Sequence, residues 1–119
     1  MAKYVDGFIL PVPKKNLKAY HKMAKLGAKV WKEYGALEYF ESYGDDMAVK
    51  FGVPFPKLVK PKQGEVIVFS WIVYKSRAHR DKVNAKVMKD KRMNTFDPKK
   101  MPFDLKRMAW GGFEVMVQS

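Results

Sequence analysis

Residues 65–74 read EVIVFSWIVY and form the most strongly strand-like segment of the chain. Alternate residues of a β-strand point to opposite faces of its sheet. Both faces of this segment are apolar apart from one serine. One face carries Val66, Val68, Ser70, Ile72 and Tyr74, and the other carries Ile67, Phe69, Trp71 and Val73. A strand with two apolar faces is typical of a sheet that is covered on both sides.

Three further strands and two helices flank this segment. Strands are predicted over 3–12, 36–43 and 107–117, and helices over 14–34 and 77–89. The resulting order, β-α-β-β-α-β, predicts an α+β protein with the ferredoxin-like fold, in which two helices cover one face of a four-stranded antiparallel sheet. The length of 119 residues fits a single domain over residues 1–119.

The helices of such a fold leave the second face of the sheet uncovered. Four strands spaced by about 4.8 Å span about 19 Å, and two helices about 10 Å wide cover that width once. The sequence therefore predicts a homodimer in which two sheets pack face to face as a dimeric α/β barrel. The alternative is a monomer in which the proline-rich stretch 51–64 folds over the open face.

The composition excludes several classes of site. The chain has no cysteine, so disulfides, thiolate nucleophiles and cysteine-ligated zinc are excluded. With only two histidines, we expect no metal site and no cofactor. The N-terminal segment lacks the apolar core of a signal peptide, and no apolar run approaches the roughly 18–20 residues of a membrane span. We therefore expect a cytoplasmic protein that does not contact a membrane.

The chain is strongly basic, with a net charge of +12. On a helical wheel of residues 14–34, seven lysines fall within one arc. They are Lys14, Lys15, Lys18, Lys22, Lys25, Lys29 and Lys32. Such a face could bind RNA or another anion. Because the arc carries no arginine and no aromatic residue for base stacking, a solvated face is the preferred interpretation, and RNA or anion binding is the alternative.

Polar residues also occur on the predicted strands, among apolar neighbours. They are Asp6, Glu41, Ser70, Arg107 and Glu114. A charge on a buried face must be paired or must line a wet cavity. We expect Arg107 to pair with Asp6 or Glu114, since the first and last strands are neighbours in this fold. Together with Trp71 and Trp110, these residues are candidates for a pocket that binds a small organic molecule or activates it by proton transfer. The alternative is a structural ion pair, and whether the protein is an enzyme stays open.

A series of short motifs runs along nearly the whole chain. They are YVDGF at Tyr4–Phe8, VFSW at Val68–Trp71, RD and N at Arg80, Asp81 and Asn84, RM at Arg92–Met93, MPFD at Met101–Asp104, KRM at Lys106–Met108 and GGFE at Gly111–Glu114. In these residues the chain resembles the YbaA-like family of small bacterial proteins. The resemblance implies a ferredoxin-like fold of the dimeric α/β-barrel kind. The lysine- and proline-rich stretch 44–64 departs from the more acidic, polar stretch of a typical member.

Other proteins with this kind of barrel include cofactor-independent monooxygenases and haem-degrading enzymes. Those enzymes use Asn, Trp and His around a cavity between sheet and helices. This chain offers Asp6, Trp71 and His79 in a similar order, although Asp stands in place of Asn. We interpret Trp71 as a core residue and His79 as a solvent-facing helix residue. The sequence thus predicts a protein that binds or processes a small molecule, without naming the reaction.

Overall fold

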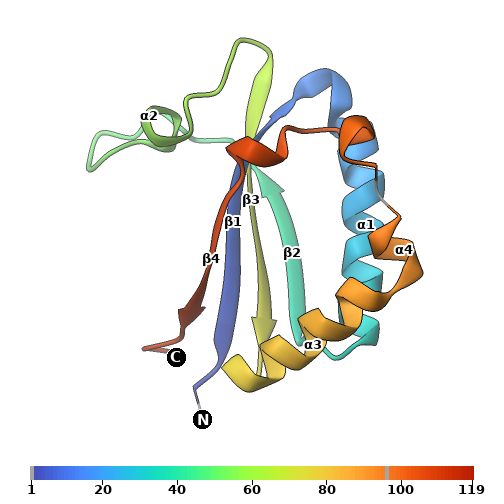
Figure 1. Cartoon of the computed structure of the whole chain (residues 1–119). Coiled ribbons are helices and arrows are strands. Elements are labelled where there is room, and N and C mark those ends of the chain that lie inside the picture. Colours follow the sequence, from blue (N-terminus) through green and yellow to red (C-terminus); the bar gives the residue numbers. More distant parts are fainter. Residues whose placement is uncertain (1, 96) are drawn as a thin grey trace.

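A four-stranded antiparallel sheet organises the computed structural model, which describes residues 2–95 and 97–119 (Figure 1). Its strands are β1 (Tyr4–Pro13), β2 (Glu38–Tyr43), β3 (Glu65–Tyr74) and β4 (Ala109–Glu114). They lie in the order β2-β3-β1-β4, and every neighbouring pair is antiparallel. This is the ferredoxin-like order, with the segment EVIVFSWIVY as one of the two central strands.

Two main helices, α1 (Leu17–Glu33) and α3 (Arg77–Lys89), lie on the same side of this sheet, with the single turn of α4 (Lys91–Asn94) following α3 (Figure 1). The helix α3 begins where the Ser76 hydroxyl accepts a hydrogen bond from the His79 amide at 3.1 Å. Gly35 follows α1 with a φ of 111°, a left-handed conformation that suits glycine after a helix. No helix of the described residues is long and apolar enough to cross a membrane.

The hydrophobic core lies between the helix layer and the facing side of the sheet. Buried side chains of the central strands meet those of α1 and α3 there. They include Leu10, Val12, Val30, Ile72, Tyr74, Val83 and Val87. The alternation of β1 and β3 places these strand residues on the helix side, as the period of two requires.

The last strand is shorter than its sequence pattern predicts. Residues Leu105–Arg107 form a 3₁₀ turn, and β4 begins only at Ala109. The Asp104 carboxylate stabilises this turn by accepting a hydrogen bond from the Lys106 amide at 3.0 Å. The predicted strand 107–117 is therefore wrong at both ends. The first helix also begins later than predicted, because Lys14–Asn16 form a separate 3₁₀ turn.

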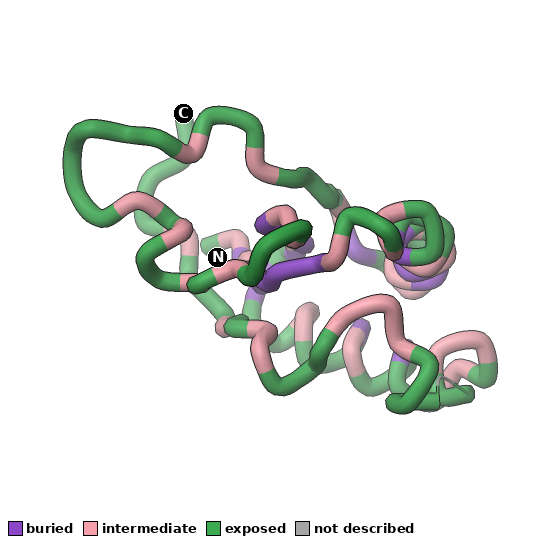
Figure 2. The backbone as a smooth tube through the Cα atoms, turned by 90° about the horizontal axis from the view of Figure 1, so that it is seen from above, coloured by how far each residue is buried: buried purple, intermediate pink, exposed green. Residues whose placement is uncertain are grey.

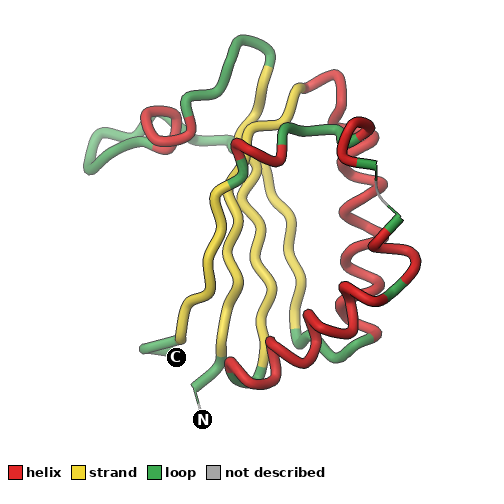
Figure 3. The backbone as a smooth tube through the Cα atoms, viewed as in Figure 1, coloured by secondary structure: helices red, strands yellow, loops and turns green. Residues whose placement is uncertain are grey.

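The proline-rich stretch is not wholly irregular, because it contains the short helix α2 (Phe55–Val59). Proline is tolerated in the first turn of a helix, which explains how Pro56 fits there. In Figures 1 and 3 this segment projects on the side of the sheet opposite the helices, and its Phe55 ring lies 6.4 Å from that of Phe69.

The face of the sheet turned away from the helices stays largely open. Phe40 is 45% exposed there and Phe113 is 63% exposed, although both belong to strands. Seen from above in Figure 2, the buried stretches gather toward the middle of the molecule, and its outer segments are mostly exposed. The stretch 51–64 reaches part of this face through Phe55 but leaves Phe40 and Phe113 exposed, so it does not cover the whole face as the monomeric alternative requires.

Candidate functional site

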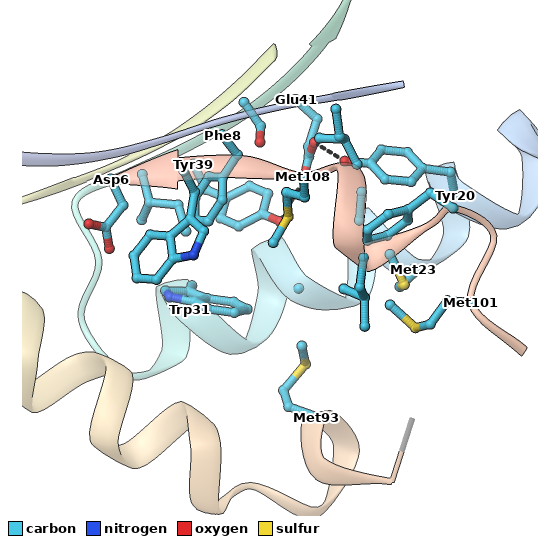
Figure 4. A pocket seen from close by; sticks show the side chains of 18 of the residues that line it. Asp6, Phe8, Tyr20, Met23, Trp31, Tyr39, Glu41, Met93, Met101 and Met108 are labelled. Carbon is cyan, nitrogen blue, oxygen red and sulfur yellow. Dashed lines mark hydrogen bonds between the residues drawn. The ribbon is translucent and has the colours of Figure 1, made fainter. Parts of the chain in front are cut away.

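A cavity of about 360 Å³ lies between the sheet and the helix layer. Its walls come from four parts of the chain. The sheet supplies Asp6, Phe8, Tyr39, Glu41, Ser70 and Trp110, and α1 supplies Tyr20, Met23, Ala24, Gly27 and Trp31. Asn84 and Met88 come from α3. Figure 4 shows the labelled side chains around this space.

The fourth wall is the connection between α3 and β4, which we call the strap (residues 90–95 and 97–108). The strap contributes Met93, Met101, Phe103, Leu105 and Met108 to the cavity. Its path runs from α4 along α1 and back to the sheet (Figure 1). A segment that the sequence presents as an irregular connection therefore forms one side of the site.

Both ends of the strap are fastened by arginine. At the β4 end, the Arg107 guanidinium donates to both carboxylate oxygens of Glu65, at 2.7 and 3.0 Å. Between the ends, the Asn16 side-chain amide donates to the Pro102 carbonyl at 3.0 Å. Two parallel bonds from one guanidinium to one carboxylate fix geometry as well as charge. These bonds hold the strap against β3 and the start of α1.

At the α3 end, Asp90 is the centre of the anchor. Its carboxylate accepts hydrogen bonds from the Arg92 guanidinium at 2.8 and 3.0 Å and from the Tyr34 hydroxyl at 2.8 Å. Arg92 also donates to Glu33 at 2.6 Å. The hydrogen bonds from Arg92 and then from Tyr34 hold the pKa of Asp90 far below its usual range.

A buried polar cluster occupies one end of the cavity. Asp6 is 1% exposed, and its Oδ1 lies 3.2 Å from Nε of Arg80. That pair is close enough for an ion pair, yet its orientation leaves both atoms without a hydrogen bond among the described residues. The other oxygen, Oδ2, accepts from the Asn84 side-chain amide at 3.3 Å. The Arg80 guanidinium also lies 4.9 Å from the centre of the Tyr4 ring.

Asn84 connects this cluster to α1. Its side-chain oxygen accepts hydrogen bonds from the Trp31 indole at 3.0 Å and from the Tyr74 hydroxyl at 3.1 Å. Burial, and next the charge of Asp6, raise the pKa of Tyr74 well above its usual value. Tyr74 therefore stays protonated and remains a donor at neutral pH.

A second polar group, Glu41, stands on the edge strand β2. Its two carboxylate oxygens accept hydrogen bonds from the Tyr20 hydroxyl at 2.7 Å and the Tyr39 hydroxyl at 2.8 Å. Burial first, and then the adjacent Glu41 carboxylate, raise the pKa of both tyrosines far above the usual value. Gly27 permits this arrangement, because a Cβ there would lie 2.9 Å from the Tyr39 hydroxyl.

Four of the pocket residues predicted from the sequence line this cavity together. They are Asp6, Glu41, Ser70 and Trp110. All four lie on strands and point toward the helices, as their positions in the paired strands require. The structure therefore brings these four candidates together around one cavity, and ligand binding there stays a prediction.

Three of the predicted pocket residues lie elsewhere. Trp71 follows Ser70 on β3, so it points to the open face, where it stacks on Phe40 at 4.9 Å. Arg107 lies in the turn before β4 and pairs with Glu65, so its expected pairing with Asp6 or Glu114 is wrong.

Glu114 ends β4 as an exposed residue beyond the cavity. It pairs with Tyr4 on β1. The cavity begins two residues further along β1, at Asp6. A charged residue at a strand end can reach water, so no buried partner is required for it.

Sequence reasoning missed two features of the site: the partners of Asp6, and the methionines that line the cavity. Arg80 and Asn84 are four residues apart on α3 and so share one helix face, a signal that was available in the RD and N motif. Five of the eight methionines line the cavity: Met23, Met88, Met93, Met101 and Met108. Methionine spacing along the chain gave no periodic pattern that predicts this gathering.

His79 does not line the cavity, and it is half-buried where the sequence predicted a solvent-facing residue. Its Nδ1 accepts a hydrogen bond from the Lys75 amide at 3.0 Å, and its ring meets Tyr74 edge-on. Burial, and next the charges of Lys75 and Lys82, lower the pKa of His79. His79 therefore stabilises the start of α3 by accepting a hydrogen bond from the backbone just before it. Throughout residues 2–95 and 97–119, no group of three or more metal-ligating side chains is found.

The predicted lysine arc is displayed on the outer side of α1. Lys18, Lys22, Lys25, Lys29 and Lys32 lie on α1, whereas Lys14 and Lys15 lie in the 3₁₀ turn before it, and all seven are exposed. The aromatic residues of the same helix, Tyr20 and Trp31, contact the cavity on the inner side. RNA or anion binding by this face stays a prediction.

Comparison with known proteins places this architecture in a family. Residues 3–105 match the model of a protein family of unknown function, DUF1428. The chain belongs to this family. It is 44% identical over 115 residues to the uncharacterized protein YbaA of Escherichia coli K12, covering 97% of each chain, and equally similar to YbaA of Shigella flexneri. The resemblance predicted from the short motifs is thus confirmed.

A solved structure supports the fold. The crystal structure of a dimeric ferredoxin-like protein from an uncultured marine organism matches this chain with a TM-score of 0.60, and covers 100% of both chains. The two sequences are 16% identical. The ferredoxin-like fold predicted from the element order is therefore confirmed.

The motifs that carry the family resemblance gather at the cavity. Asp6 comes from YVDGF and Ser70 from VFSW, and both line it. Met93, Phe103 and Met108 come from the three motifs of the strap and line the opposite wall. Eight of the twenty residues that line the cavity therefore come from the motifs in which this chain resembles its family.

Proposed function

We propose that the protein binds a small, largely apolar organic molecule in the cavity between the sheet and the helix layer. The observation that carries this proposal is the cavity itself. Its volume of about 360 Å³ falls within the range of about 300–1,000 Å³ that is usual for ligand sites. Apolar lining with a few convergent polar groups is also usual for such sites.

The lining is suited to a ligand with an aromatic or otherwise polarisable body. Aromatic rings from the sheet and α1 form one side, and methionines from the helices and strap form the other. Methionine side chains are flexible and polarisable, so they adapt to ligands of different outline. The polar groups Asp6, Glu41 and Asn84 orient the bound molecule, and a carboxylate in this position can accept a proton from it.

The proposal includes a homodimer formed through the open face of the sheet. Phe40, Phe55, Phe69 and Phe113 are each about half exposed there, which corresponds to roughly 400 Å² of aromatic surface. A standard interface buries about 800 Å² on each partner. The neighbouring Trp71 and the stretch 51–64 supply further apolar surface, and the matching marine protein is dimeric.

A titration with a neutral naphthalene dye, 6-propionyl-2-(dimethylamino)naphthalene, tests the cavity. Its fluorescence shifts to shorter wavelength in apolar surroundings, and we expect saturable binding of one dye per chain. The substitution Ala24→Leu adds bulk to the cavity wall and should weaken dye binding at least tenfold, which is about 1.4 kcal/mol.

The matched control is Ala28→Leu, because Ala28 is a half-buried alanine of the same helix that does not line the cavity. It should leave the affinity within about twofold of the wild type. Equal dye affinity in the Ala24→Leu variant and the wild type would show that the dye binds elsewhere, and would contradict the proposed site.

A further inference from the structure

The charge of the cavity is opposite to that of the chain. The protein carries a net charge of +12. Yet the charged residues that line the cavity are both acidic, Asp6 and Glu41, and no Lys, Arg or His occurs among its described lining residues. Twenty-four basic side chains are therefore distributed so that none of those described faces this space.

We propose that the ligand is an organic amine, whose ammonium group binds Glu41 while its apolar body occupies the aromatic and methionine-lined cavity. This inference rests on the proposed function, because it specifies the ligand class of the same cavity. The shared chemistry is a positive charge on an apolar body, as in an arylalkylamine.

Glu41 has the acceptor capacity that this role requires. An ionised carboxylate offers about four lone-pair positions, and Tyr20 and Tyr39 occupy two of them. In the described structure no basic nitrogen lies within 4 Å of this carboxylate. Glu41 thus holds a negative charge that hydrogen bonds orient and that no ion pair neutralises.

The side chains around Glu41 suit a cation as well. The rings of Trp31 and Tyr39 lie 6.0 Å apart and both line the cavity beside Glu41. Aromatic faces attract cations through their electron-rich centres. Because burial and then Glu41 raise the pKa of Tyr20 and Tyr39, the two phenols stay protonated and keep the carboxylate in place.

Asp6 provides a second, independent indication of a ligand. Its Oδ1 is buried and lacks a hydrogen bond among the described residues, although Arg80 lies close enough to balance its charge. Asp6 lines the same cavity. A buried acceptor without a donor is costly, and a donor group on the bound molecule would satisfy it. Both acidic residues therefore favour a ligand that donates hydrogen bonds.

An anionic ligand fits this arrangement less well. Inside the cavity its charge would face Glu41, which no described cation neutralises, while the charge of Asp6 is already balanced by Arg80. Like charges at close range oppose binding. Lys18 and His21 do not line the cavity but an adjoining groove, which shares Tyr20, Ala24 and Glu41 with it.

Three probes of equal size separate these possibilities. They are 2-(2-naphthyl)ethylamine, the corresponding alcohol, and 2-naphthylacetate. Calorimetric titration at pH 7.5 keeps the amine protonated and the carboxylate ionised. We expect the amine to bind at least about tenfold more tightly than the alcohol, and the carboxylate to bind most weakly.

The substitution Glu41→Gln removes the charge and keeps the side-chain shape. It should reduce the preference for the amine over the alcohol to about threefold or less, because it weakens binding of the amine much more than binding of the alcohol. Glu38→Gln is the matched control. It removes the same charge from the same strand, but at a position that faces away from the cavity, and the preference should persist.

The outcomes distinguish this inference from the proposed function. Equal affinities for amine and alcohol, or a preference for the carboxylate, would overturn the amine assignment and leave the apolar site intact. Failure of all three probes to bind would overturn both. A thermal melt of the Glu41→Gln variant like that of the wild type shows that a lost preference reflects recognition and not unfolding.

Discussion

Asp6 shows how strongly one residue depends on its surroundings. It is a carboxylate in the middle of a central strand, and it is almost fully buried. Arg80, whose side chain is 17% exposed, lies beside it and supplies the compensating charge. Burial lowers the pKa of Arg80, but Asp6, Tyr4 and Asp81 together raise that pKa by more. Each charge is tolerated because the other is present.

We predict that Asp6→Ala destabilises the protein by about 3–5 kcal/mol, because it leaves the Arg80 guanidinium without its buried partner. Urea denaturation monitored by circular dichroism measures this change. The control is Asp81→Ala, which removes the exposed partner of the same arginine and should cost less than about 1 kcal/mol. A similar loss of unfolding free energy in the two variants would show that the buried pair contributes no more to stability than the exposed pair.

Among the elements, the strap differs most from a regular helix or strand. Its three short turns each begin at an aspartate, and these aspartates are spaced by seven residues. Asp90, Asp97 and Asp104 accept hydrogen bonds from the amides of Arg92, Lys99 and Lys106. Such caps stabilise single turns that no helical ladder supports. The strap therefore holds its methionines at the cavity without forming a long helix.

The anchor at Asp90 makes the stability of the strap depend on pH. Because the folded-state pKa of Asp90 lies below its unfolded value of about 3.9, its contribution is complete at neutral pH and is lost as the pH falls below about 4. We predict that Asp90→Asn lowers the melting temperature at pH 7. The difference from the wild type should shrink steadily between pH 4 and pH 2, when thermal melts are recorded across that range.

A suitable control is Asp97→Asn, which keeps a capping oxygen and removes a carboxylate charge that has no ion pair within the described part of the chain. It should lower the melting temperature at pH 7 by less than Asp90→Asn does. A difference for Asp90→Asn that stays constant from pH 7 to pH 2 would contradict the proposed role of this carboxylate.

On the scale of the whole molecule, the two faces of the sheet differ in how far the chain covers them. One face is covered by helices and strap and contains the cavity, and the other presents aromatic rings to solvent in the isolated chain. The stretch 51–64 reaches this second face at Phe55 but leaves Phe40 and Phe113 exposed. A second copy of the chain is the proposed cover.

We predict that the wild type is a dimer at about 10 µM in sedimentation equilibrium, and that Phe113→Glu converts it to a folded monomer. A charge in the centre of an apolar interface would be buried without a partner, which opposes association. Met88→Glu is the control, since Met88 is an exposed apolar residue on the helix side. A monomeric wild type at this concentration would contradict the dimer.

The fold was largely readable because its signals are local. The alternation in EVIVFSWIVY predicts a strand with two apolar faces, and the element order predicts the ferredoxin-like sheet; both are observed. The sequence also singled out Asp6, Glu41 and Ser70 as polar residues on strands, and the register of the paired strands places them on one face. The start of β4 was predicted too early, because residues 105–107 form a turn capped by Asp104 and do not pair as a strand.

The partners within the site depended on tertiary structure. Asn84 lies 78 residues from Asp6 in sequence, and only the packing of α3 on the sheet brings its amide to that carboxylate. The strap carries Met93 and Met108 to the cavity along a path that no periodic pattern encodes. Local sequence determines which face a side chain takes, because backbone geometry repeats. Which distant group it meets is decided by how helices and connections pack, because that packing depends on the whole chain at once.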